Sequence, residues 1–262
     1  MKKIVVCYKW VLNDADIRVN EKSRDLDFEK SKGQINEYDR NALETGAKLK
    51  EASGGAEFVG ITCGADVENS AKDALSRGPD AVYLLNDASL ADADSTTTAK
   101  TLAGMIRFLG EADVVICSEG SSDLYAQQNG PRLAALLGYP SVSYVSAVSL
   151  DGDVLTLNRK LEQGTETVTV AAPVVISVSP DVCEAPIPSV KQILGAKKKP
   201  AHALTLEGVG LSADAVKPLT TVNSVKAPLG NRKAVNMAAG GESVPEAVAK
   251  LVKQLAADGL LQ

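Results

Sequence analysis

Hydroxyl, acidic and glycine residues gather in the segment 119–131, directly after a short apolar run. Ser121 and Ser122 supply hydroxyls, Asp123 supplies a carboxylate, and Gly130 allows close approach to the backbone. A helix is expected to begin here, and the free N–H groups and dipole at a helix N-terminus favour a phosphate. An ordinary N-cap formed by Ser122 or Asp123 explains the same residues equally well. Both interpretations stay open on these residues alone.

Three further groups of polar or thiol-bearing residues lie beside predicted strands. They are Cys7 and Lys9 at the end of the first strand, Asn36 and Asp39 before the first helix, and Cys63 and Gly64 at the end of the second strand. Ligands of an open α/β sheet bind beyond the carboxyl ends of its strands. All of these residues therefore stand where a ligand site is expected.

Several sequence features resemble catalytic, nucleotide-binding or metal-binding motifs, but their context does not support these functions. Residues 53–55 (SGG) follow a predicted helix and precede a strand, the reverse of a phosphate-binding loop. Residues 208–213 match Gly-x-Gly spacing but lie outside any strand–helix–strand unit. His202 has no nearby nucleophile or paired carboxylate, and the 4 cysteines form no C-x-x-C pair. We therefore predict no catalytic residues and no metal site.

Composition narrows the function classes. The chain has 262 residues, a net charge of −5 and 45% hydrophobic residues, which provide enough apolar material for a core. The negative charge and 4% aromatic content argue against nucleic acid as a partner. No apolar segment approaches the ~20 residues that span a bilayer. We expect a cytoplasmic protein with reduced thiols.

Strands and helices alternate over the first two-thirds of the sequence. Strands are predicted at 4–9, 57–63, 81–85 and 113–117, and helices at 38–50, 67–76, 94–109 and 126–137. This order predicts an α/β fold with a doubly wound, mostly parallel, Rossmann-like sheet. Four strands without helices between them follow at 142–150, 154–160, 166–170 and 174–179. They predict an antiparallel extension, with a hairpin turn at Asp151-Gly152.

The sequence loosens after Pro180, and only residues 244–256 again show helical periodicity. We therefore divide the chain into an α/β domain, 1–200, to which the resemblance described below assigns nucleotide binding, and a C-terminal arm, 201–262. The arm has no obvious core of its own, so it is expected to lie on another surface, of its own domain or of a partner subunit.

Four segments, in order and with matching spacing, resemble the β (small) subunit of electron-transfer flavoproteins, and most closely its Fix-type branch. The family patterns are C-V-K-x-V-P-D, N-P-Y-D-x-x-A-x-E, D-G-D-T-A-Q-x-G-P and P-S-L-K-x-I-M-x-A-K-K-K-P. Their counterparts are residues 7–13 (CYKWVLN), 36–44 (NEYDRNALE), 123–131 (DLYAQQNGP) and 188–200 (PSVKQILGAKKKP). The resemblance runs from residue 1 to about residue 200.

The resemblance implies an electron carrier subunit rather than an enzyme. Its partner would be an α subunit that holds most of the electron-carrying FAD, while this chain would hold AMP or a second FAD. Electrons would pass between dehydrogenases and an acceptor, with a flavin dehydrogenase or quinone-linked oxidoreductase as partner. Val190, Ile193 and Leu194 would anchor such a partner. The implied nucleotide contacts are Cys7, Lys9, Asn36, Asp39, Cys63, Gly64, Ser121, Ser122, Asp123, Ala126, Gln127, Gln128, Asn129 and Gly130.

Some of the departures from the family patterns bear on ligand binding. Leu12 replaces a proline in the first, and Leu124, Tyr125 and Ala126 replace the Gly, Asp and Thr of D-G-D-T. A phosphate-facing hydroxyl and a flexible glycine are lost, so AMP and FAD both stay open as ligands, as does electron bifurcation. An adenine-nucleotide hydrolase or transferase, or a stand-alone nucleotide sensor of similar fold, are the alternatives. The electron donor, the acceptor and the pathway do not follow from the sequence.

Overall fold

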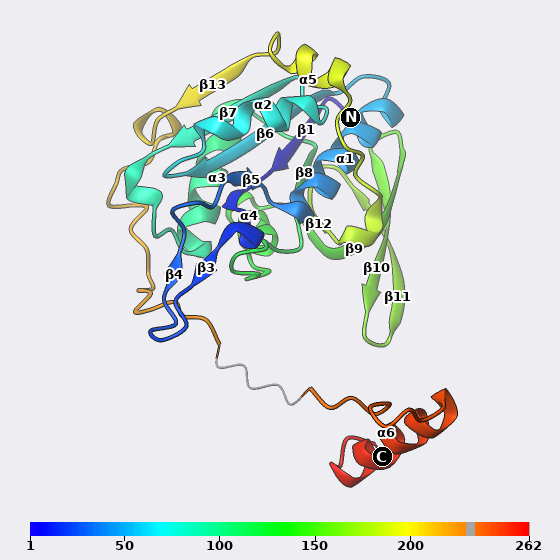
Figure 1. The fold of residues 1–262 in the computed structure, drawn as a ribbon. Coiled ribbons are helices and arrows are strands. Elements are labelled where there is room, and N and C mark those ends of the chain that lie inside the picture. Colours follow the sequence, from blue (N-terminus) through cyan, green and yellow to red (C-terminus); the bar gives the residue numbers. More distant parts are fainter. Residues whose placement is uncertain (229–233, 262) are drawn as a thin grey trace. The chain divides into compact units, whose positions relative to one another are not determined.

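A computed structural model describes residues 1–228 and 234–261 (Figure 1). The chain divides into two compact units, Met1–Val225 and Lys226–Gln262. Each unit is described by itself below. Among the described residues, no helix combines the length and apolar character that crossing a bilayer requires.

The first unit is built on a nine-stranded, mostly parallel sheet with strand order β11-β10-β9-β12-β8-β1-β6-β7-β13. The five central parallel strands are β1 (Lys3–Cys7), β6 (Glu57–Gly64), β7 (Ala81–Asn86), β8 (Val114–Ser118) and β12 (Val174–Val178). β1 lies between β6 and β8 and is parallel to both. The predicted α/β fold with a mostly parallel sheet is confirmed.

Helices cover both faces of this sheet (Figure 1). The longer helices are α1 (Glu37–Ala52), α3 (Ser95–Leu109) and α4 (Asn129–Leu137), and α2 (Ala71–Ser76) is short. Strand β1 shows how two cores arise: Ile4 belongs to the buried cluster that includes residues of α1 and α2, and Val5 belongs to the cluster that includes residues of α3 and α4. Because both faces of the central strands are buried, these strands read as continuous apolar runs.

Three of the four strands predicted for the antiparallel extension form it, but the prediction was wrong for residues 174–179, which form the parallel strand β12 of the central sheet. The extension consists of β9 (Ser141–Asp151), β10 (Val154–Leu161) and β11 (Gly164–Ala171), which form antiparallel pairs. β9 joins the two parts of the sheet, because its other neighbour, β12, is parallel to it. The turn between β9 and β10 contains Gly152 at φ 60°, which agrees with the predicted hairpin.

Several short elements were not predicted. Residues 10–35 form two small ladders: β2 (Trp10–Leu12) with β5 (Gly33–Ile35), and β3 (Arg18–Val19) with β4 (Leu26–Asp27). The expected helix 67–76 begins as a 3-10 turn, Glu68–Ser70. Further 3-10 turns are Asp14–Asp16, Ala88–Leu90, Pro180–Val182 and Glu207–Val209.

The division between domain and arm lies later in the structure than the predicted boundary after residue 200. Strand β13 (Ala201–Leu204) extends the sheet parallel to β7, and Val209 and Val216 are buried in the core shared with α3. The Asp94 carboxylate, at the start of α3, accepts the backbone N–H groups of residues 219 and 220. Residues 201–225 therefore belong to the first unit, and the packing of the arm on a partner stays a prediction.

In the described residues of the second unit, 226–228 and 234–261, the helix is α6 (Val244–Ala257). Ser243 and Glu246 form a reciprocal capping box at its start, as such a sequence favours. None of its residues is buried. Its exposed apolar side chains recur at spacings of three and four residues, at Val244, Val248, Leu251 and Val252. They make one apolar face of the helix.

Candidate functional site

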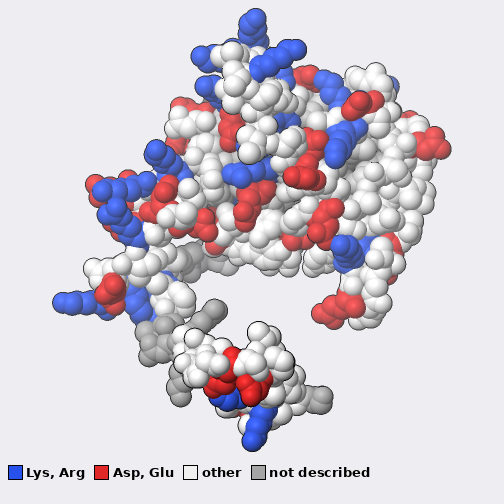
Figure 2. Space-filling view, turned by 45° about the vertical axis from the view of Figure 1, so that its right-hand side comes forward, with Lys and Arg blue, Asp and Glu red and all other residues white. Residues whose placement is uncertain are grey.

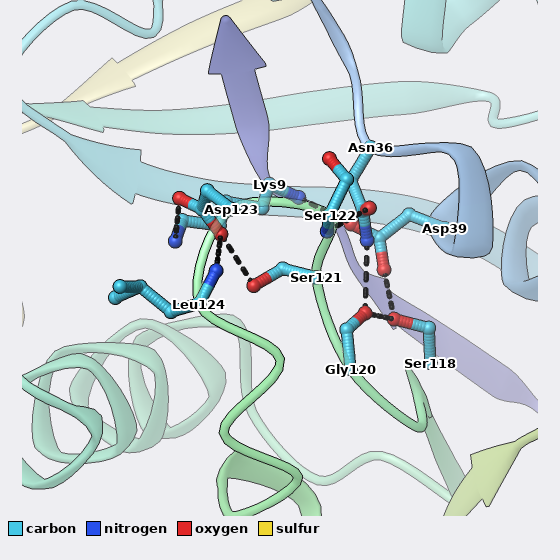
Figure 3. A network of polar contacts seen from close by, with 9 residues as sticks. All are labelled: Lys9, Asn36, Asp39, Ser118, Gly120, Ser121, Ser122, Asp123 and Leu124. Carbon is cyan, nitrogen blue, oxygen red and sulfur yellow. Dashed lines mark hydrogen bonds and ion pairs between the residues drawn. The ribbon is translucent and has the colours of Figure 1, made fainter. Parts of the chain in front are cut away.

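Three segments that are far apart in the sequence meet where β1 and β8 end (Figure 3). Lys9 follows β1, Asn36 and Asp39 stand at the start of α1, and residues 118–123 follow β8. Hydrogen bonds and one ion pair connect the three segments. The structure thus brings together most of the polar residues that the sequence placed near strand ends.

Asp39 is at the centre of this network and is only 3% exposed. Its Oδ2 accepts the backbone N–H of Lys9 at 2.7 Å. Its Oδ1 lies 2.5 Å from the Ser118 hydroxyl oxygen, which is also 2.8 Å from the Gly120 carbonyl oxygen. Burial raises the pKa of Asp39 to about 6, although the hydrogen bonds oppose this shift.

Asn36 is fully buried and connects the loop after β8 to the start of α1. Its Nδ2 donates to the Gly120 carbonyl oxygen at 3.0 Å, and its Oδ1 accepts the Ser122 backbone N–H at 3.0 Å. Its own backbone N–H donates to the Lys9 carbonyl at 3.0 Å. Protein partners therefore occupy the side chains of both Asn36 and Asp39, and a ligand contact from either stays untested.

Lys9 and Asp123 form the more accessible half of the network. Lys9 Nζ lies 2.5 Å from Asp123 Oδ2, and both side chains are partly exposed. Asp123 Oδ1 accepts the Ser121 hydroxyl at 2.6 Å and the Leu124 backbone N–H at 2.8 Å. Burial opposes ionisation of Asp123, but the Lys9 ammonium and these hydrogen bonds outweigh it and hold the pKa of Asp123 below its usual range.

Helix α4 begins later than expected, at Asn129 rather than Ala126. Tyr125 and Gln127 have φ angles of 45° and 56°, in the left-handed region that a right-handed helix cannot contain. The residue before α4 is Gln128, whose side chain makes no capping hydrogen bond. Neither Ser122 nor Asp123 caps this helix, so the simple N-cap interpretation of these residues is wrong.

Two further observations mark the start of α4. Asn129 Oδ1 is buried and has no hydrogen-bond partner among the described residues. Gly130 is also buried, and a Cβ on it would overlap the Ser177 hydroxyl of β12. The small size of Gly130 therefore serves the packing of α4 on the sheet, whereas the sequence interpretation assigned it to close approach of a ligand. This leaves residues 126–129 as the candidate ligand contacts at the uncapped start of α4.

The thiol residues differ in their exposure, with Cys7 and Cys117 buried and Cys63 partly exposed. Cys7 and Cys117 are buried on neighbouring strands, and a hydrogen bond between them, followed by burial, raises the pKa of Cys7. Burial likewise raises the pKa of Cys63 to about 12. The Gly64 carbonyl accepts the Asp87 backbone N–H at 2.9 Å.

The described residues contain no group of three or more His, Cys, Asp or Glu side chains that could hold a metal ion.

Sequence reasoning missed three residues of the site. The Ser118 hydroxyl and the Gly120 carbonyl both make hydrogen bonds within the network. The predicted strand ended one residue before Ser118, which is the last residue of β8. The ring of Tyr125 lies 5.4 Å from the ring of Tyr38, and its hydroxyl donates to Glu119 Oε1 at 2.5 Å. A departure from the family pattern at Tyr125 was the only signal for this contact in the sequence.

The segment predicted to anchor partners forms helix α5 (Val190–Ala196), with a reciprocal capping box from Ser189 and Gln192. Val190 is 73% exposed, and Ile193 and Leu194 are exposed as well. Ile187, just before the helix, is 92% exposed and had not been singled out. We refer to these four apolar side chains as the α5 surface.

Basic residues surround the α5 surface but do not all play the same part. Figure 2 shows Lys and Arg gathered at the upper end of the domain, where Figure 1 places α5. Lys191, Lys197 and Lys198 are exposed. Lys199 is half-buried and donates to three carbonyl oxygens at the end of α2, those of residues 75, 78 and 79. Lys199 therefore fixes α5 to its own domain.

A comparison with known protein families agrees with this architecture. Residues 26–208 match the family model described as "Electron transfer flavoprotein domain". The match covers more than half of the chain and includes the network residues 36–39 and 118–123, the start of α4 and α5. Proteins with this domain are in general flavin-binding electron carriers. The chain belongs to the electron transfer flavoprotein domain family.

Proposed function

We propose that this chain is the β subunit of a heterodimeric electron-transfer flavoprotein and holds an adenine nucleotide, AMP or a second FAD, beyond the ends of β1 and β8. The observation that carries the proposal is the uncapped start of α4, in the segment that follows Asp123, the ion-pair partner of Lys9. A helix N-terminus presents unpaired N–H groups and partial positive charge, which suit a phosphate. The buried, unpartnered Asn129 Oδ1 supports a ligand donor at the same place.

Different residues are available to the phosphate and to the remainder of the nucleotide. Backbone N–H groups of residues 128–130 and the Lys9 ammonium would bind phosphate, while exposed Ala126 and Gln127 and the partly exposed Cys63 and Gly64 would line the remainder. A bound flavin supplies the electron chemistry, and this chain binds, orients and shields it. The chain itself makes and breaks no bonds, which is why no catalytic residue is assigned.

The proposed partners correspond to the two exposed apolar surfaces. The apolar face of α6 suits an α subunit that holds the principal FAD, because such a face is stable in water only when covered. The α5 surface, with its basic surroundings, suits a flavin dehydrogenase or quinone-linked oxidoreductase. We place the complex in the cytoplasm, and it needs neither nucleic acid nor membrane insertion.

The test is co-expression with a candidate α subunit, followed by identification of the released nucleotides by mass. One FAD with one AMP, or two FAD, per heterodimer is the expected result. Lys9→Met should lower the second nucleotide without lowering the principal FAD, whereas Lys72→Met, an exposed lysine on α2, should change neither. A complex with no second nucleotide would contradict the proposal, and turnover of ATP by the chain would favour a hydrolase.

A further inference from the structure

The hydrogen bonds around Ser118 require one more proton than an ionised Asp39 provides. Ser118 Oγ lies 2.5 Å from Asp39 Oδ1 and 2.8 Å from the Gly120 carbonyl oxygen. A carbonyl and a carboxylate are both pure acceptors, and a serine hydroxyl carries a single hydrogen. With Asp39 ionised, one of these two short oxygen–oxygen contacts therefore contains no hydrogen.

A protonated Asp39 resolves this conflict. Its Oδ1–H donates to Ser118 Oγ, Ser118 donates to the Gly120 carbonyl, and Asp39 Oδ2 still accepts the Lys9 backbone N–H. Both short contacts of the Ser118 hydroxyl oxygen then contain a hydrogen, whereas with an ionised Asp39 one of them sets two oxygen atoms against each other without one. The same proton fixes the start of the loop 119–123, because Gly120 is held by Ser118 from one side and by Asn36 from the other.

We propose that Asp39 is a proton-binding positioning residue: its acid form holds the loop after β8, and binding of an anionic nucleotide at that loop increases the fraction of Asp39 that is protonated, with net uptake of protons from solvent. The binding half of this inference rests on the proposed function, and the protonation half does not. Asp39 is too deeply buried to touch the ligand in this arrangement, so it acts through Ser118, Gly120 and Lys9.

The charges around Asp39 agree with an acid form. The nearest cation, the Lys9 ammonium, is already paired with Asp123. Burial is the largest influence on the pKa of Asp39 and raises it, and it outweighs the hydrogen bonds from Ser118, the Lys9 backbone N–H and Asn36, which favour the carboxylate. The other titratable group facing it is Cys7, whose pKa is raised, so its thiol carries no charge to stabilise either form. A phosphate bound nearby would add negative charge and strengthen the hold on the proton.

Proton and nucleotide binding are then linked in both directions. A rise of about one unit in the pKa of Asp39 on binding corresponds to about a tenfold gain in affinity for the acid form. AMP should therefore bind up to about tenfold more tightly at low pH than above the pKa of Asp39 in the complex. A phosphate monoester also titrates near pH ~6, so the comparison needs a variant that keeps only the titration of the ligand.

The first experiment needs no ligand. Infrared difference spectra of the full-length protein are recorded over a pH series, for the wild type and for Asp39→Asn. We expect a protonated-carboxyl band that titrates near pH 6 in the wild type and is missing in Asp39→Asn. Ser118→Ala keeps the carboxyl but removes its partner, so its band should titrate at a different pH. The control Asp123→Asn should keep the band. A wild type without the band would overturn the acid form of Asp39.

The second experiment measures AMP binding by calorimetry at several pH values, in buffers of different ionisation enthalpy. Net proton uptake that the wild type shows and Asp39→Asn lacks is the expected result. Equal proton uptake and equal pH dependence in the two proteins would overturn the linkage. If neither AMP nor FAD binds at any pH, the proposed ligand and the linkage both fail, while the infrared titration still decides the acid form independently.

Discussion

The site beyond β1 and β8 and the α5 surface differ in whether their side chains already have partners within the chain. In the first, the side chains of Asn36 and Asp39 are buried and already bonded to protein. In the second, Val190 and Ile187 are apolar and lie open to solvent. The first region is completed within its own chain, so its residues should affect folding and function together. The second is proposed to dock a partner, and in that role its residues should affect association alone.

The largest effect is expected from Asn36→Ala. This change leaves the Gly120 carbonyl and the Ser122 N–H without their buried partner, and it should cost about 3 kcal/mol of unfolding free energy. Asn41→Ala is the matched control in the same helix, since Asn41 donates to the carbonyls of Pro180 and Cys183. Denaturant unfolding should show a loss for both variants. Only Asn36→Ala should also reduce nucleotide content, and an equal reduction in the two would remove the special role of Asn36.

A second comparison adds one methyl group to a glycine in each region. Gly130→Ala forces a Cβ against the Ser177 hydroxyl and should cost about 2 kcal/mol, whereas the space beside Gly195 in α5 is open. Gly195→Ala should be neutral or slightly stabilising. Thermal unfolding measures both, and the double variant Gly130→Ala/Ser177→Ala should recover part of the loss. Equal stability of the two single variants would contradict the packing described here.

Truncation of the α5 surface tests the other region. Val190→Ala should weaken binding to a dehydrogenase partner by about thirtyfold, or ~2 kcal/mol, and should slow electron transfer at every salt concentration. Unfolding and the flavin spectrum should not change, because Val190 is 73% exposed. Val154→Ala, an exposed valine in β10, serves as the control. If Val190→Ala transferred electrons at the wild-type rate at every salt concentration, the proposed docking role of the α5 surface would be wrong.

The smallest effect separates two neighbouring lysines. Lys199→Met loses three hydrogen bonds to the end of α2 and should lower stability by about 1 kcal/mol. Lys198→Met should leave unfolding unchanged and should alter only the salt dependence of partner association. Unfolding curves and association rates distinguish the two. Identical behaviour would mean that all the lysines after α5 belong to one docking rim.

The sheet could be predicted from sequence because its central strands, such as β1 and β12, are buried on both faces and read as apolar runs. Strand β13 could not, because its pairing with β7 depends on residues more than a hundred positions away, and its sequence AHAL lacks strand-forming side chains. The ladders within residues 10–35 are two or three residues long, too short to show periodicity.

The sequence identified most residues of the site but not the roles that they play in the structure. Lys9, Asn36, Asp39 and Asp123 stand at strand or helix ends, a position that sequence order reveals. That Asn36 and Asp39 hold the loop after β8 depends on three segments meeting, which no local pattern records. The late start of α4 follows from the left-handed conformations of Tyr125 and Gln127, which residues of these types rarely adopt.

The capping box of α5 has a consequence for the docking role proposed for this helix, because it affects how quickly partners would exchange. Ser189 and Gln192 close the start of this seven-residue helix, and Lys199 fixes the segment that follows it. An anchor that already has its bound shape loses little conformational entropy on docking, so it can associate rapidly through a small contact area. A small contact area also allows rapid dissociation. An electron carrier must leave each partner after every exchange, and a short, rigid anchor supports that cycle better than an extended interface would.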